Sequence, residues 1–162
     1  MAVVNTTTAA IAAESARKVA SSGKPTVCFV GQLESVSGDS IGSTYRLISV
    51  PGDFILTSLE IASDALGGSC AADIGVYQMT GNGGAVVDAD EFASAVSLVS
   101  AVAWTAVLEE AAAADIDKIG KPLWERLGVT ANPGIGYDIV ATLTGASAAA
   151  GTVAIRARGY YA

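Results

Sequence analysis

The chain has 162 residues, of which only 15% are charged, and its formal net charge is −7. This length is typical of one domain with a sizeable core, but the charged fraction lies well below the roughly 25% of ordinary soluble domains. The basic residues are scattered, which disfavours nucleic-acid binding because phosphate contacts need clustered lysine and arginine. So low a fraction of charged residues suits either a protein whose surface lies against other proteins or a compact alanine-rich domain.

The first 24 residues are rich in alanine, threonine and serine and differ from the rest. They carry no signal-peptide pattern, and no stretch of the chain reaches the about 20 apolar residues of a membrane span, so we expect no membrane contact. The run IAAESARKVA makes about two helical turns, which are marginal alone in water. Residues 1–24 are therefore predicted to be an arm, extended or partly helical, with Arg17 and Lys18 as interface residues. A frayed terminus is the alternative.

From residue 25 the pattern changes to short runs rich in β-branched and aromatic residues, separated by turn residues. The runs TVCFVGQ, STYRLISV, DFILTSLEIAS and AADIGVYQ predict strands, and TGNGG at residues 80–84 predicts a hairpin turn. Strict alternation in DFILTSLEIAS places Ile55, Leu59 and Ile61 on one side and Phe54, Leu56 and Glu60 on the other.

The sequence in the middle of the chain does not predict its secondary structure clearly. The stretch DADEFASAVSLVS is compatible with a short helix that Asp88 or Asp90 would cap, and AWTAVLEE suits a strand. Pro122 pre-sets a helical turn in PLWERLG. Three side chains of that turn are predicted to face inwards, namely Leu123, Trp124 and Leu127.

The last two runs, YDIVATLTG and TVAIRARGYY, read as strands of a closing hairpin with the uncharged loop GASAAAG between them. One face of the final run is apolar, with Val153, Ile155 and Ala157. The other face carries Arg156, Arg158 and Tyr160, and at most one of Tyr160 and Tyr161 can face the core. We predict that these residues lie at a subunit contact, with plain solvated surface as the alternative.

Chemistry-bearing residues are few. Histidine is absent, so the usual general base near neutral pH is missing, and Ser-His-Asp or Cys-His arrangements are impossible. The two cysteines, Cys28 and Cys70, lie in apolar contexts that favour buried free thiols over a disulfide. We predict no catalytic, metal-binding or cofactor-binding residue and no cofactor.

The acidic clusters are DADE, with Asp88, Asp90 and Glu91, and DID, with Asp115 and Asp117. The calcium-loop pattern with its glycine and final glutamate is missing from both. A solvated helix start is therefore the favoured interpretation of Asp88 and Asp90. No spacing supports a pair of glycosidase carboxylates.

Several short strands without βαβα alternation predict an all-β domain over residues 25–162, with one or two short helices. The architecture expected is an antiparallel β-sandwich, jelly-roll-like.

Some longer motifs resemble those of a known group. The stretches ADIGVYQ, NGGAVVDADEFASA and KPLWERLG, within a likeness from about Ser37 to Tyr161, resemble small structural proteins encoded among the head genes of tailed bacteriophages. The resemblance implies a capsid decoration, or cement, protein: a small jelly roll on the outer surface of the virion, often a homotrimer, that clamps neighbouring major capsid protein subunits and is no enzyme. The alternative is a host-surface or carbohydrate-binding module.

Overall fold

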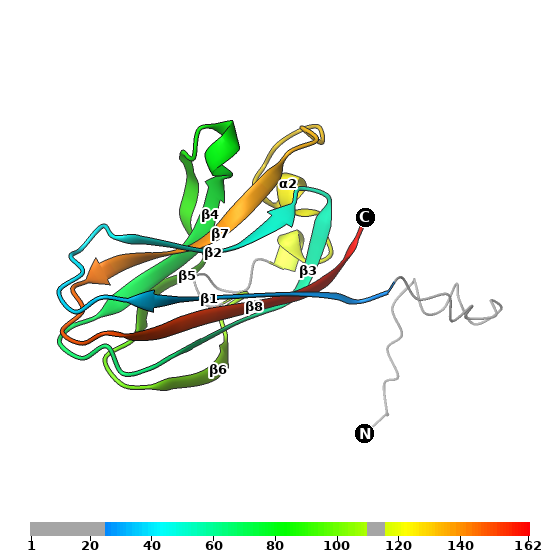
Figure 1. The fold of residues 1–162 in the computed structure, drawn as a ribbon. Coiled ribbons are helices and arrows are strands. Elements are labelled where there is room, and N and C mark those ends of the chain that lie inside the picture. The colour runs from blue at the N-terminus through cyan, green and yellow to red at the C-terminus, as the bar shows by residue number, and fades with distance from the viewer. Residues whose placement is uncertain (1–24, 110–115) are drawn as a thin grey trace, which may run out of the picture.

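The structure is a computed structural model that describes residues 25–109 and 116–162. Eight strands and three short helical elements lie within these residues (Figure 1). The strands are β1 (Val27–Ser35), β2 (Thr44–Pro51), β3 (Phe54–Ser63), β4 (Ala71–Gln78), β5 (Val86–Ser97), β6 (Val102–Ala106), β7 (Gly136–Gly145) and β8 (Gly151–Tyr161). The helical elements are η1 (Thr80–Asn82), η2 (Ile116–Lys118) and α2 (Leu123–Arg126). The predicted arm, with Arg17 and Lys18, lies outside the described residues.

The strands form two four-stranded antiparallel sheets that pack face to face (Figure 1). Sheet I has the order β1-β8-β3-β6, and sheet II has the order β2-β7-β4-β5. Among the described strands, β4 and β5 are joined as a hairpin across the TGNGG turn, and the other successive strands alternate between the sheets. This is the strand order of a jelly roll, so the predicted all-β sandwich is confirmed. None of the described helices is long and apolar enough to cross a membrane.

The predicted closing hairpin is wrong. β7 lies between β2 and β4 in sheet II, whereas β8 lies between β1 and β3 in sheet I. The alanine-rich loop therefore crosses from one sheet to the other. A loop of this length spans the about 10 Å between packed sheets as easily as it turns a hairpin, so local sequence did not distinguish the two.

A bulge in β3 overturns the strict alternation predicted for this strand. Its register against β8 shifts between Leu56 and Ser58. Because a bulge inserts one unpaired residue, the faces exchange at that point. Phe54 and Leu56 before the bulge, and Leu59 and Ile61 after it, all join one core.

Residues 86–97 form β5, so the helix considered for this stretch is wrong. Asp88 and Asp90 lie within the strand and cap no helix. The register against β4 shifts three times, and Ala95 has a φ of 53°. These irregularities break the period-2 pattern, and pairing with β4 overrides the helix preference of the alanines.

The other local predictions hold in most respects. Leu123 is buried in α2, and Trp124 and Leu127 are partly buried against the core, as predicted. Both cysteines are free, but only Cys70 is buried. Cys28 is exposed because it lies on the outward face of β1, whose alternation is regular.

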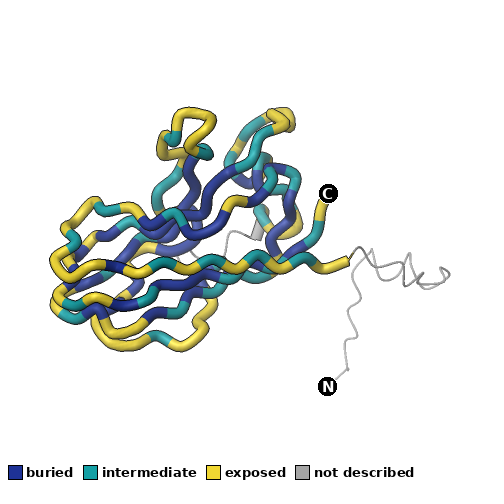
Figure 2. Tube along the Cα trace, viewed as in Figure 1, coloured by how far each residue is buried: buried dark blue, intermediate teal, exposed yellow. Residues whose placement is uncertain are grey.

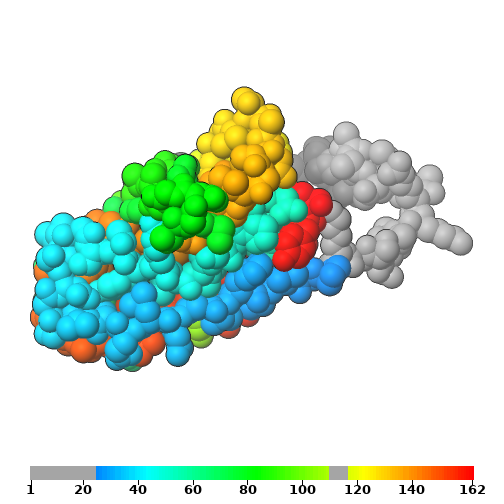
Figure 3. Space-filling model, turned by 45° about the horizontal axis from the view of Figure 1, so that its top comes forward, coloured from blue at the N-terminus to red at the C-terminus, as the bar shows by residue number. Residues whose placement is uncertain are grey.

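The sandwich closes at one edge where β1 meets β2; Figure 3 shows blue β1 against the cyan part of the chain. A Cβ at Gly31 would lie 1.8 Å from the backbone oxygen of Leu47, in a part of β2 where the register shifts. No side chain fits that space, so the close approach of the two strands requires glycine here.

We expect Gly31→Ala to lower the free energy of unfolding by about 3 kcal/mol, because the neighbouring atom is backbone and cannot move aside as a side chain would. Urea unfolding followed by circular dichroism measures the change. The control is Gly81→Ala, where a Cβ meets nothing within 4 Å, and it should change stability by less than about 0.5 kcal/mol. Equal stability of the two variants would contradict the close approach.

Candidate interaction surface

Alternation in β8 turns two arginines and a tyrosine to the outer face of sheet I, as predicted. The inward residues of this strand, Val153, Ile155 and Ala157, are all 0% exposed. Arg156, Arg158 and Tyr160 are partly exposed on the opposite face. The structure therefore brings these three predicted interface residues onto one face.

Glu60 of β3 is the register neighbour of Arg156 and binds both arginines. Arg156 Nε donates to Glu60 Oε2 at 2.9 Å, and Arg158 Nη1 donates to the same oxygen at 3.2 Å. The side chains of Arg156 and Glu60 are 23% and 19% exposed, and that of Arg158 is 42% exposed. Ion pairs with this much exposure add little stability, but they hold the guanidinium groups in place on the sheet.

Trp104 of β6 extends this cluster to the edge of the sheet. The guanidinium carbon of Arg156 lies 4.4 Å from the centroid of the indole ring, within cation–π distance. Trp104 is nevertheless 41% exposed, and Val30, which pairs with Arg156 from the other side, is 60% exposed. The outer face thus carries a band of five residues, called here the sheet I row: Val30, Glu60, Trp104, Arg156 and Arg158.

Tyr161 lies on the opposite face of β8 from the predicted interface residues Arg156, Arg158 and Tyr160. Its ring lies 5.6 Å from that of Phe54 in an edge-to-face contact, on the inner side of sheet I. It lines a groove of about 540 Å³ at the end of the sandwich, together with residues such as Phe29, Met79 and Ile135. Of the two adjacent tyrosines, Tyr160 faces outwards.

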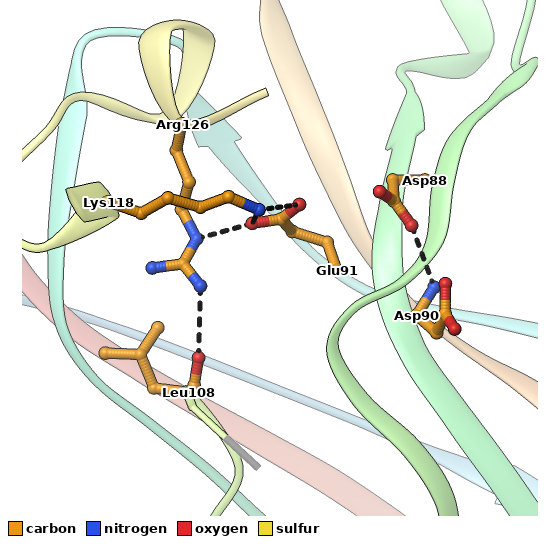
Figure 4. Close-up of polar contacts among 6 residues, drawn as sticks. All are labelled: Asp88, Asp90, Glu91, Leu108, Lys118 and Arg126. Carbon is orange, nitrogen blue, oxygen red and sulfur yellow. Dashed lines mark hydrogen bonds and ion pairs between the residues drawn. The ribbon is translucent and has the colours of Figure 1, made fainter. Parts of the chain in front are cut away.

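The predicted acidic cluster DADE is split by the fold. Figure 4 shows Glu91 pointing towards Arg126 and Lys118, away from Asp88 and Asp90. Arg126 Nε donates to Glu91 Oε1 at 2.7 Å, and Lys118 Nζ donates to both carboxylate oxygens at 3.0 and 3.1 Å. The side chains of Glu91 and Arg126 are 2% and 5% exposed.

This buried cluster attaches the connection between β6 and β7 to β5. Arg126 Nη2 also donates to the carbonyl of Leu108 at 3.2 Å, and its guanidinium carbon lies 5.2 Å from the centroid of the Phe92 ring. Sequence reasoning missed the pair because 35 residues separate Glu91 from Arg126. The signal that could have indicated it is an arginine within the apolar turn PLWERLG.

Within the described residues, no group of three or more histidine, cysteine or carboxylate side chains could hold a metal ion. Asp115 of the DID cluster lies outside those residues. Every lysine and arginine that the structure describes is ion-paired within the chain, namely Arg46, Lys118, Lys121, Arg126, Arg156 and Arg158. Paired basic groups offer little to nucleic-acid phosphates.

Glu91→Gln should lower the free energy of unfolding by about 3 kcal/mol, because it removes the carboxylate charge from a buried ion pair and keeps the shape of the side chain. Chemical unfolding of the purified variant measures the loss. Glu125→Gln is the matched control: its side chain is 43% exposed and 4.0 Å from Lys121 Nζ, so the expected change is below about 0.5 kcal/mol. Similar small losses in both variants would show that the buried cluster contributes little.

Comparison with known proteins identifies the fold. No protein-family model matches the chain, and no curated protein does. Among solved structures, the chain is similar to a chain of the "Cyanophage Pam1 capsid asymmetric unit", with a TM-score of 0.58, 14% sequence identity and 100% of each chain covered. At this identity the likeness shows a shared fold.

Proposed function

We propose that this chain is a structural protein of a bacteriophage virion, a decoration protein that binds the outer surface of the capsid and bridges neighbouring major capsid protein subunits. The observation that supports this most is the fold, which the chain shares over its whole length with a chain of a cyanophage capsid. The motif likeness to small phage head proteins points the same way. In this proposal residues 25–162 are one β-sandwich domain.

The sheet I row is the surface of this chain that best fits capsid binding. Tryptophan and arginine are enriched where protein interfaces gain most of their binding energy. Glu60 and the ring of Trp104 already hold Arg156, so less side-chain freedom is lost when a partner docks. The apolar Val30 adjoins these groups on the neighbouring strand β1.

Bridging requires many weak contacts and no reaction centre. A decoration protein that touches several subunits at once gains avidity from contacts that are individually modest. The proposal also includes a homotrimer, which the resemblance to decoration proteins implies, without enzymatic activity or cofactor. It also includes an arm, residues 1–24 with Arg17 and Lys18, that reaches a neighbouring subunit.

The geometry does not favour the carbohydrate-binding alternative. Sugar recognition by stacking needs exposed aromatic rings that lie together. Among the described residues, the exposed aromatic side chains are Trp104 and Tyr161, and they lie on opposite sides of sheet I.

Capsids assembled without this protein provide the test. After mixing and ultracentrifugation, we expect the full chain to sediment with the particles. Trp104→Ala combined with Arg158→Ala should weaken binding at least about tenfold, as expected for truncation of interface hot spots. The control is Val86→Ser, which changes a 55% exposed side chain on the distant β4–β5 hairpin and should bind as the wild type does.

A wild-type chain that stays in the supernatant would refute the decoration role. If the Trp104 and Arg158 double variant binds fully and the Val86 control loses binding, the capsid contact lies elsewhere on the chain and not at the sheet I row.

A further inference from the structure

The groove that Tyr161 lines lies at the end of the sandwich where the described chain begins. The start of β1, the end of β8 and the turn between β2 and β3 lie together at this end (Figures 1 and 2). The groove has a volume of about 540 Å³ and is called here the end groove. Its apolar lining consists of Phe29, Val50, Pro51, Met79, Ile135 and Tyr161. Because β1 begins here, residues 1–24 join the domain next to an apolar groove.

Asp53 is the charged residue in the lining of the end groove. Its backbone carbonyl accepts a hydrogen bond from the N–H of Ala162 at 2.9 Å. Within residues 25–109 and 116–162, its carboxylate has no hydrogen-bond or ion-pair partner. The hydroxyl of Ser49 and the amide oxygen of Asn132, also in the lining, are already engaged in hydrogen bonds within the chain. A segment that fits this groove therefore combines an apolar side chain with a cation.

Residues 1–24 have that combination. They contain three basic residues and one acidic residue, a net charge of +2, so the rest of the chain has a net charge of −9. The basic residues are Arg17, Lys18 and Lys24, and the apolar Val19 directly follows Lys18. Each lysine and arginine of the described residues is ion-paired within the chain. The cations outside those ion pairs are therefore the three of residues 1–24.

Other carboxylates of the described chain do not offer the same site. A second hollow, beside Glu109, has two large apolar side chains in its lining, Leu59 and Leu108. Asp88 and Asp90 lie on β5 and line neither the hollow nor the end groove. The end groove is thus the place where a larger apolar lining and a carboxylate without a described partner meet.

We propose that the end groove of each copy of this chain binds residues 1–24 of another copy. Arg17 or Lys18 pairs with Asp53, and Val19 lies among the apolar side chains. This contact names the partner of the arm, and it rests on the homotrimer and the arm included in the proposed function. In extended form, 24 residues span at most about 80 Å, which is enough to reach a neighbouring copy.

Charge and symmetry favour a second copy as the source of the arm. Whole copies with a net charge of −7 repel one another, but a segment of charge +2 is attracted to a body of charge −9. Contacts between two different surfaces of the same chain generate closed rings such as trimers. The arm and the end groove are two such surfaces.

Charge exchange between the arm and the groove tests this contact and needs no capsid. Sedimentation velocity of the full chain over a range of concentrations should show an oligomer. Arg17→Glu with Lys18→Glu should raise the concentration needed for association at least about tenfold, and Asp53→Lys should do the same. The triple variant that combines these substitutions should associate as the wild type does, because the attraction is restored with opposite signs.

The control is Asp90→Lys, which makes the same change of charge at an exposed position of β5 outside the groove and should leave association unchanged. The proposal is overturned if the wild type is monomeric throughout, if the arm variant associates normally, or if the triple variant fails to associate. It is also overturned if trypsin cleavage after Arg17 and Lys18 is blocked in the monomer, because the arm then lies in its own groove.

The same chains separate this proposal from the decoration role. Copies that associate through the arm but do not sediment with capsids would overturn the decoration role alone. Chains that sediment with capsids but fail the charge exchange would overturn the arm contact alone.

Discussion

Apolar burial between the two sheets is the interaction on which the rest of the structure depends. The inner faces of β3 and β8 pack against those of β4 and β7, and their large side chains, such as Ile61, Ile155, Ile74 and Ile139, are fully buried. Burying each such side chain contributes about 1.5–3 kcal/mol. Since this core occupies one face of each sheet, polar groups are left to the outer faces, the connections and the two ends of the sandwich.

Charges are then sorted into local clusters around that core. On sheet II, Arg46 Nη1 donates to Asp138 Oδ2 at 2.7 Å and Arg46 Nη2 to the carbonyl of Gly84 at 2.6 Å, which fixes the β4–β5 turn to the sheet. On sheet I, Glu60 gathers two arginines, and Glu91 secures the connection before β7. With the described basic groups paired internally, the surfaces left for a partner are aromatic, aliphatic, neutral or acidic. Such a distribution suits a protein whose role is contact with other protein.

Sequence reasoning succeeded where structure follows a local period. The alternation of β1 and β8 is regular, so the outward positions of Arg156, Arg158 and Tyr160 were predictable from β8 alone. It failed where an irregularity interrupts the period. The bulge near Thr57 exchanges the faces of β3. The register shifts of β5 interrupt its alternation, so that its alanine-rich sequence does not show the pattern of a strand. Such bulges form against a particular partner strand, and the local sequence does not identify that partner.

By itself, the sequence determined the all-β class, most strand positions, the faces of the regular strands and the absence of histidine chemistry. Only the tertiary structure decided that the last two strands belong to different sheets, that Glu91 pairs with Arg126 and not with its acidic neighbours, and that backbone hydrogen bonds join distant loops at one end of the sandwich. The physical reason is one of range. Side-chain alternation is set by neighbouring residues, whereas strand pairing, buried ion pairs and loop contacts depend on which distant segments share the core.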